Sequence, residues 1–395
     1  MGVENVVMLE QLDDAGLREL SRRGDELGVL SVYVNADPSQ DPNLLAAAID
    51  LKNRYRELQR RASEDGSLER GREVAAALDR LWPQIETLLT PAVSGRGRIA
   101  FFGLGSDWTS HLESAMPVTT RLVFDSGPFI HPLLEMLDEG RKAGVVIITA
   151  DDARLLEWHV GVLRAVQTME NEYVQAPHER AGQIGGGPPG QFNTPVREQR
   201  KARQRERSER FLDQVVDAVA KVAEENGWQR ILVSGGDTWT DAAISRFPAT
   251  VRDKVLADTR VLSGVDDASL ARMVTERLHT QHKEYEQQLL TQVREAAGTK
   301  SGALGLSEVT GALNDGRVAH LVYDPEVRYV GSVDANGLLY AGEEAPPSAK
   351  ATPEPRLTER LVERALEIDA RITPVEGASG GVLAEANGIG ALLRW

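Results

Sequence analysis

The stretch Gly144-Val-Val-Ile-Ile-Thr149 decides the fold class of this sequence. A short, continuous run of β-branched residues is typical of a strand that is buried on both faces. After an acidic turn, residues 154–160 and 162–167 predict two further strands of a meander. A long helical stretch then leads to another apolar strand at residues 230–234. Strands and helices therefore alternate, and we expect a protein of the α/β (multi-domain α+β) class.

The chain has 395 residues, which is too long for one small domain. Breaks in the pattern predict three domains: an N-terminal α/β domain (1–140), a middle domain (141–266) and a C-terminal domain (267–395). The middle domain contains a glycine-rich loop (182–195) and a basic helix (196–225), and the C-terminal domain contains a mobile insert (342–356). Asn336-Gly337 lies between two apolar runs and predicts a β-hairpin.

Composition excludes several classes of function. Lys and Arg number 45 against 60 Asp and Glu, so the net charge is −15 and any contact with RNA must come from a local basic patch. The chain has no cysteine, which excludes disulfides, thiolate catalysis and cysteine zinc sites. The seven histidines form no ligand-type spacing, and we expect neither a metal nor an organic cofactor.

The start of the sequence lacks a basic segment followed by an apolar one, so we expect no signal peptide. The longest apolar run, around Val145–Ile148, is too short to cross a bilayer. We therefore expect a cytoplasmic protein with no membrane contact. We also expect it to be a monomer.

The most informative segment is Gly185-Gly-Gly-Pro-Pro-Gly-Gln191. Glycine has no side chain to collide with a neighbour, so such a loop can bring its backbone very close to another molecule. Gln191 ends the segment with a donor and an acceptor on one amide. A linker that carries an incidental glutamine is the alternative interpretation.

A basic stretch follows, from Arg197 to Arg210, with seven basic and three acidic residues. Spacings of three and four place Arg200, Arg203, Arg207 and Arg210 on one face of a helix. Guanidinium groups bind phosphates in a bidentate manner and stay charged. The residues predicted to bind RNA phosphate are Arg197, Arg200, Lys201, Arg203, Arg207 and Arg210. A solvated helix with Glu–Arg pairs is the alternative.

Several stretches together resemble a known family. They are Gly144–Trp158, His178–Gln191 with the basic helix, Ile231–Gly236, Arg360–Glu367 and Gly388–Arg394. In this order they resemble the archaeal and eukaryotic class 1 peptide-chain release factors and Pelota. The sequence is most similar to the bacterial branch grouped with the Vms-like release factor (VLRF) family.

The resemblance implies a three-domain, release-factor-like architecture with a ribonuclease-H-like middle domain and a C-terminal α/β/α sandwich. It also implies that the loop enters the ribosomal peptidyl transferase centre, where a glutamine helps water attack the ester of peptidyl-tRNA. Gly190 and Gln191 are then the catalytic candidates, with Gln183 as a second candidate, and Gly185, Gly186 and Gly187 approach the ester. The family's contiguous Gly-Gly-Gln is absent, since Pro188-Pro189 precedes Gly190.

The resemblance implies a release or rescue factor for stalled or split ribosomes that hydrolyses peptidyl-tRNA. The family's Asn-Ile-Lys-Ser stop-codon motif is absent, and Asp50-Leu-Lys-Asn53 does not replace it, so we expect independence from stop codons. The implied partners are the ribosome, through large-subunit rRNA, and peptidyl-tRNA, and a translational GTPase is a further candidate. Two alternatives remain open: a non-enzymatic ribosome binder of the Pelota or hibernation type, and a nuclease that cuts the tRNA acceptor end.

Overall fold

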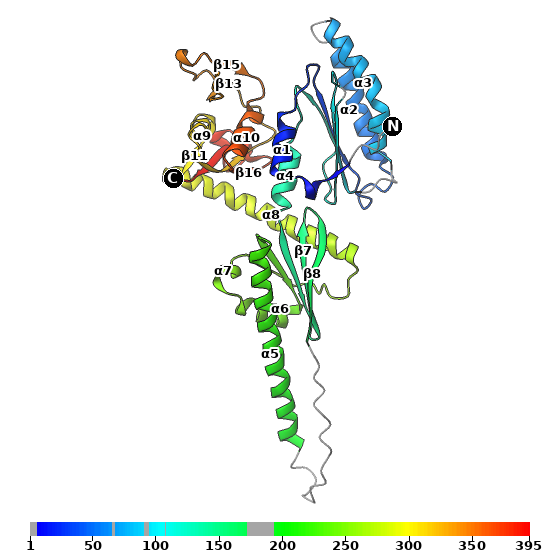
Figure 1. Cartoon of the computed structure of the whole chain (residues 1–395), viewed down its shortest axis with the longest axis vertical. Helices are drawn as coiled ribbons and strands as arrows, with labels where there is room; N and C mark the ends of the chain where they lie inside the picture. The colour runs from blue at the N-terminus through cyan, green and yellow to red at the C-terminus, as the bar shows by residue number, and fades with distance from the viewer. Residues whose placement is uncertain (1–5, 65–67, 91–94, 107, 172–192) are drawn as a thin grey trace, which may run out of the picture. The chain divides into compact units, whose positions relative to one another are not determined.

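A computed structural model describes residues 6–64, 68–90, 95–106, 108–171 and 193–395. The chain forms two compact units (Figure 1). The first combines Met1–Gly140 with Arg277–Trp395, and the second is Arg141–Glu276. Helices and several separate sheets confirm the multi-domain α/β class. The three-domain boundaries stay a prediction.

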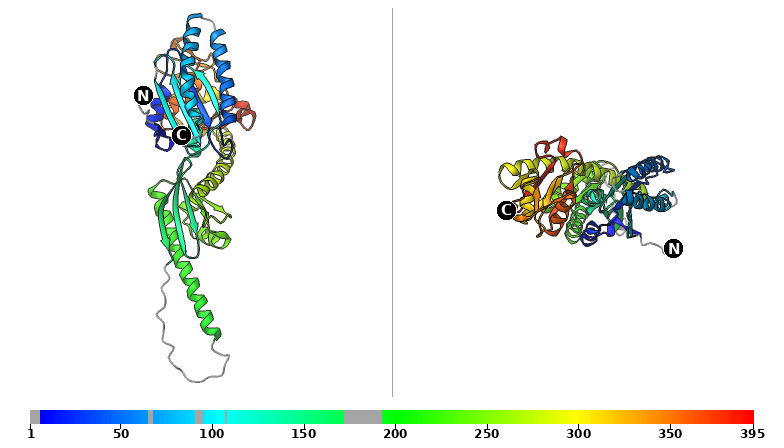
Figure 2. Two further views of the ribbon diagram at one scale, coloured as in Figure 1. Left: turned by 90° about the vertical axis from the view of Figure 1, so that its right-hand side faces the viewer. Right: turned by 90° about the horizontal axis from the view of Figure 1, so that it is seen from above.

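The N-terminal part of the first unit is built on a five-stranded sheet of order β1-β4-β3-β2-β5. Its strands are β1 (Val7–Met8), β2 (Val29–Asn35), β3 (Gly97–Gly103), β4 (Thr109–Ser114) and β5 (Arg121–Asp125). Its helices are η1 (Leu9–Gln11), α1 (Asp14–Arg22), α2 (Leu45–Glu64), α3 (Leu68–Leu88) and α4 (His131–Glu139). Helices α2 and α3 lie side by side over one face of the sheet, where their apolar residues form a core with β2 and β3 (Figure 2).

The start of the chain differs from its sequence pattern, which predicts one helix over Leu9–Arg22. The structure has the short helix η1 and then α1. Asp13 separates them, because its carboxylate accepts a hydrogen bond of 2.8 Å from the backbone N–H of Gly16 and so caps α1.

The C-terminal part of the first unit has a four-stranded sheet of order β11-β17-β12-β16. Its strands are β11 (Gly302–Leu304), β12 (Val318–Tyr323), β16 (Arg371–Pro374) and β17 (Ile389–Leu393). Its helices are α8 (Asp267–Gly298), whose first residues belong to the second unit, α9 (Gly305–Asn314), α10 (Leu357–Glu367), η3 (Ala378–Gly380) and η4 (Ala384–Ala386). Apolar residues of α8, among them Leu289 and Val293, pack against Val322 of β12.

A smaller sheet of order β14-β13-β15 completes this part. Strands β13 (Gly331–Val333) and β14 (Leu339–Ala341) form the predicted hairpin, with Gly337 at a φ of +80°. The segment 342–356, whose mobility stays a prediction, contains η2 (Pro347–Ala349) and β15 (Thr352–Glu354). Strand β15 pairs with β13 alone, so Pro353 is tolerated at a sheet edge.

The second unit contains a mixed sheet of order β10-β9-β6-β7-β8. Its strands are β6 (Ala143–Ile148), β7 (Asp152–His159), β8 (Val162–Glu170), β9 (Arg230–Ser234) and β10 (Val255–Asp258). Its helices are α5 (Asn193–Glu225), α6 (Gly236–Arg246) and α7 (Ala249–Arg252). The antiparallel meander β6-β7-β8 continues into the parallel strands β9 and β10, in agreement with the predicted ribonuclease-H-like arrangement.

The core of this unit explains the apolar stretch that begins at Gly144. Every residue of β6 is buried, as the unbroken run of apolar residues predicts. A Cβ atom on Gly144 would lie 2.2 Å from Cε3 of Trp228, so only glycine lets the indole pack flat on the strand. The Trp228 ring is fully buried, and its Nε1 donates a hydrogen bond of 2.9 Å to Oε2 of Glu157.

Candidate nucleic-acid interface

Helix α5 changes character along its length. From Phe211 onward it buries one apolar face in the core of the second unit, through Phe211, Leu212, Val215, Val216 and Val219. Residues 201–206 are all exposed. Figure 1 shows this first part of α5 running on beyond the ends of β7 and β8. The basic half of the helix therefore projects from the sheet, with the side chains of residues 201–206 open to solvent.

The exposed cations of this half include residues that the sequence predicts to bind RNA phosphate. Lys201, Arg203 and Arg205 are exposed and form no ion pair with any described residue. Arg210 is also exposed and pairs with Glu206, one turn earlier on the same helix. For Arg197 and Arg200 the structure describes the helical backbone and not the side chains. Arginine and lysine side chains held in this way suit the phosphate backbone of a nucleic acid.

The charges do not form a single stripe. At 100° per residue, Arg203 and Arg210 flank Arg207 on one face of α5, whereas Lys201 and Arg205 lie on other sides of the helix. The helix thus presents positive charge in more than one direction.

Arg207 has a different role from the exposed cations, although the sequence predicts that it binds phosphate. Its Nε donates a hydrogen bond of 3.0 Å to Oδ1 of Asn171, and its Nη2 donates to the backbone carbonyl of the same residue. Asn171 directly follows β8 and is the last described residue before segment 172–192. The guanidinium therefore joins the helix to the point where the chain leaves the sheet.

The same asparagine is fixed from the other side by the turn between β6 and β7. Its backbone N–H donates to the carbonyl of Asp151 at 2.7 Å, and its Nδ2 donates to the carbonyl of Ala150 at 2.8 Å. We call Asn171, Arg207 and the carbonyls of Ala150 and Asp151 the stem clamp. These contacts use both the side-chain amide and the backbone of Asn171, and they join it to α5 and to the turn between β6 and β7.

The turn under the clamp is itself closed by hydrogen bonds. The backbone N–H of Thr149 donates to the carbonyl of Asp152 at 2.8 Å, and the N–H of Asp152 donates back to Oγ1 of Thr149 at 3.0 Å. This side-chain turn explains why the acidic pair follows the apolar strand. The turn fixes the carbonyl groups of Ala150 and Asp151, which accept the hydrogen bonds of Asn171.

Helix α5 begins at Asn193, fourteen residues before Arg207. At 1.5 Å per residue the helix carries the chain about 21 Å away from the clamp. The two ends of segment 172–192 are therefore set by a clamped asparagine and by the tip of a long helix.

The predicted catalytic residues lie outside the described residues. These are Gly190, Gln191 and the second candidate Gln183, together with Gly185, Gly186 and Gly187. The structure thus describes the frame of the loop and not the loop. Sequence reasoning missed Asn171, because an asparagine after a strand is common and its partner lies 36 residues away.

Among the described residues no group of three or more histidine, aspartate and glutamate side chains is arranged to hold a metal ion. Within the same part of the chain no helix has the length and hydropathy needed to cross a membrane.

Comparison with known proteins finds one family model that matches part of the chain. Residues 128–283 match the family described as bacterial archaeo-eukaryotic release factor family 10, and this range contains the whole second unit. For this part of the chain the match confirms the predicted relationship to the release factors of archaea and eukaryotes. The closer resemblance to the VLRF family stays a prediction. No curated protein matches the chain.

Among solved structures, the archaeal translation termination factor aRF1 is 15% identical, with 99% of each chain covered and a TM-score of 0.26. Dom34 of S. cerevisiae, described as a translation termination-like factor that interacts with Hbs1, is 10% identical, with coverage of 76% of this chain and 80% of Dom34 and a TM-score of 0.38. Archaeal Pelota, in a model of its ribosome-bound form with ABCE1, is 14% identical, with coverage of 76% and 77% and a TM-score of 0.39. At these TM-scores the likeness adds nothing to the functional argument.

Proposed function

We propose that this protein is a ribosome-associated release or rescue factor that hydrolyses the ester of peptidyl-tRNA on stalled or split ribosomes. The observation that carries the proposal is the match of residues 128–283 to a release factor family, in the unit that holds both the glycine-rich loop and the basic helix. The proposal has two parts: a role in termination or rescue on the ribosome, and hydrolysis of the peptidyl-tRNA ester.

The basic half of α5 supports the ribosomal part. Lys201, Arg203 and Arg205 are exposed on a chain whose net charge is −15, so an anionic surface would be contacted through this helix. Large-subunit rRNA is the surface that the family relationship implies, and the contacts are with phosphate and carry no sequence information.

Hydrolysis of the ester is the proposed role of the glycine-rich loop. Ester hydrolysis needs a positioned water and stabilisation of the developing oxyanion, and neither requires a metal. The carboxamide of Gln191 has no useful pKa, so it orients the water through its donor and acceptor and does not act as a general base. The surrounding RNA supplies the remaining polar groups, and Gly190 lets the backbone approach the ester.

Release without a stop codon is part of the proposal. Residues 50–53, which do not replace the family's stop-codon motif, lie inside α2, where Asp50 pairs with Arg54 at 2.9 Å. A translational GTPase that delivers the protein is a further proposed partner.

The test is peptide release from purified ribosomal complexes that carry labelled peptidyl-tRNA. We expect release by the wild type and loss of release in Gln191→Ala, with Gln183→Ala close to the wild type. Equal release by the wild type and both variants would remove the two glutamines from the mechanism. If wild-type protein binds the complexes and releases no peptide, the proposed hydrolase activity is wrong.

A second candidate is a ribosome binder without hydrolase activity. The observation that favours it is the sequence Pro188-Pro189-Gly190-Gln191, which departs from the contiguous Gly-Gly-Gln of the family. Co-sedimentation with idle ribosomes and an intact peptidyl-tRNA ester would support this candidate. Gel analysis of the tRNA tests the third candidate, a nuclease that cuts the tRNA acceptor end, since such an enzyme would shorten the tRNA.

A further inference from the structure

Strand β5 has a free edge. It lies at the end of the first sheet, and among the described strands it pairs with β2 alone. Leu122 and Phe124 pack against the core under α2 and α3, so Arg121, Val123 and Asp125 lie on the other face of the strand. The backbone groups on the outer side of such a strand are available to another chain.

A cleft of about 470 Å³ runs along this edge. One wall is the unbroken segment Thr119–Asp125, and the opposite wall is formed by Pro325–Arg328, after β12, and by Thr358 and Glu359 of α10. A cleft whose wall is a continuous edge strand has the geometry of strand addition, in which an extended peptide hydrogen-bonds to the sheet.

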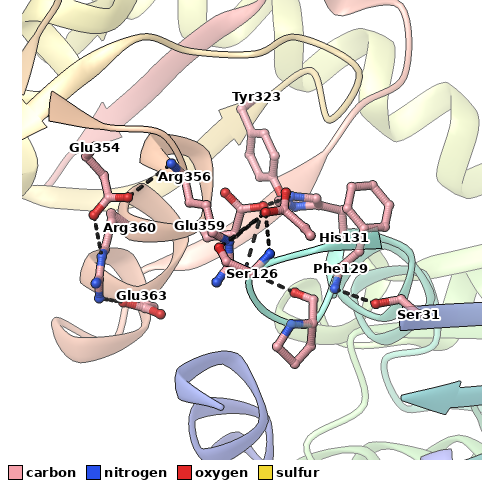
Figure 3. A network of polar contacts seen from close by, with 12 residues as sticks. Ser31, Ser126, Phe129, His131, Tyr323, Glu354, Arg356, Glu359, Arg360 and Glu363 are labelled. Carbon is pink, nitrogen blue, oxygen red and sulfur yellow. Dashed lines mark hydrogen bonds and ion pairs between the residues drawn. The ribbon is translucent and has the colours of Figure 1, made fainter. Parts of the chain in front are cut away.

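The floor of the cleft is fixed by buried polar contacts, which Figure 3 shows from close by. Nδ1 of His131 lies 2.6 Å from the hydroxyl of Tyr323, and its Nε2 lies 3.7 Å from Oε1 of Glu359. Burial alone raises the pKa of Glu359, but the contacts with His131 and Arg356 outweigh it and lower the pKa. These groups satisfy one another, so the floor shapes the cleft and leaves recognition to the walls and the mouth.

The width of the cleft is also fixed. Nη1 of Arg121 on β5 binds Oε1 of Glu326 on the opposite wall at 2.8 Å, and its guanidinium lies 5.7 Å from the centre of the Phe129 ring. The bridge joins the two walls at Arg121, the first residue of β5.

The charged residues at the cleft indicate the chemistry of its occupant. Each carboxylate that lines it has a cation nearby: Arg121 for Glu326, and Arg356 for Asp125 at 3.8 Å and for Glu359 at 3.9 Å. By contrast, Arg328 is exposed at the mouth and forms no ion pair with a described residue. The unmatched charge is positive, which favours an occupant with a carboxylate.

We propose that the cleft beside β5 binds an extended, acidic peptide segment of a partner protein, which adds a strand to the first sheet and places a carboxylate against Arg328. Five residues of β5 span about 17 Å, so the bound segment has five or six residues. The site uses neither the loop nor α5, and it stands whether or not the protein hydrolyses peptidyl-tRNA.

The test uses the full chain and two labelled hexapeptides, EVTVTE and KVTVTK, followed by fluorescence anisotropy. We expect EVTVTE to bind the wild type about fivefold more tightly than KVTVTK, which is the effect of one exposed ion pair. Arg328→Glu should invert this preference. Arg72→Glu, at an exposed arginine on α3 outside the cleft, should leave it unchanged. Thermal unfolding of both variants confirms that they fold.

The backbone contribution is tested with EVTVTE that carries N-methyl groups at alternate residues, since these remove the hydrogen bonds to a strand edge. We expect at least a fivefold loss of binding. Unchanged binding of the methylated peptide, equal competition by free glutamate, or the same preference in Arg328→Glu would each overturn the proposal. Self-association of the chain that EVTVTE cannot compete with would assign the edge to a second copy and would also overturn it.

Discussion

Arg207 binds Asn171 through both its side-chain amide and its backbone carbonyl, and this contact joins the middle of α5 to the end of β8. The arginine belongs to a run of basic residues that looks uniform in the sequence. In the structure it is the half-buried member of that run, and its neighbours Arg203 and Arg205 are exposed. One basic helix thus holds two kinds of arginine, one that stabilises the fold and others that are free to contact a partner.

We expect Arg207→Ala to lower the free energy of unfolding of the second unit by about 1–2 kcal/mol, because it leaves partly buried acceptors of Asn171 without donors. Arg203→Ala, four residues away on the same face, is the matched control and should have no measurable effect. Urea unfolding gives the stabilities, and hydrogen exchange of the Asn171 amide reports on the stem clamp. Equal stabilities of the two variants would show that the clamp contributes nothing.

Substitution of the exposed cations of α5 should change ribosome binding and not stability. Replacement of Lys201, Arg203 and Arg205 by glutamine is expected to weaken ribosome binding. Each lost phosphate contact should reduce the slope of log K against log salt concentration by about 0.7–0.9. Co-sedimentation across a salt series measures this slope. Arg207→Gln is the control and should leave the slope unchanged, and a triple variant with the wild-type slope would show the helix to be merely solvated.

Local patterns predict the elements whose neighbours are close in sequence. The buried strand β6 follows from its run of β-branched residues, and the hairpin at Gly337 follows from the Asn-Gly pair. Strand β15 was not predictable, because three residues that include Pro353 are a weak strand signal and pair through a distant edge. Local periodicity carries no information about such tertiary pairing.

In the candidate site, too, some features follow from the sequence itself and others depend on tertiary contacts. Charge counting finds the basic half of α5, since charge is a property of the sequence itself. It does not separate Arg207 from Arg203, because the difference depends on where Asn171 lies in space. The roles of Gln191 and Gln183 stay predictions, since both residues lie outside the described part of the chain.

The packing of Trp228 on Gly144 gives a third prediction. A Cβ atom at residue 144 would lie 2.2 Å from the indole, so Gly144→Ala must displace a fully buried ring, and we expect it to cost about 1–3 kcal/mol of stability. Gly311→Ala in α9 is the control for the same change, since no atom lies within 4 Å of a Cβ there. It should stabilise its helix by about 0.5–1 kcal/mol. Urea unfolding that finds the two variants alike would contradict the packing argument.

The last prediction concerns pH and His279 of α8. Nδ1 of His279 lies 3.0 Å from Oε1 of Glu139 at the end of α4, and this hydrogen bond raises the pKa of the histidine above 6.5, although partial burial and Lys283 act in the other direction. Glu286 also faces the group and favours its charged form. Because the folded pKa is raised, the contribution to stability is complete below pH 6.5 and is lost as the pH rises through the folded value.

We therefore expect His279→Gln to be less stable than the wild type at pH 6 and nearly equal to it at pH 9. Since about half of the His279 side chain is exposed, solvent screening keeps the difference below about 1 kcal/mol. Urea unfolding at the two pH values measures it. Glu139→Gln removes the other partner, so the histidine substitution in that background should lose its dependence on pH. A stability difference of the same size at both pH values would show that the imidazole contributes by packing alone, because only the protonated ring gains from the charge of Glu139.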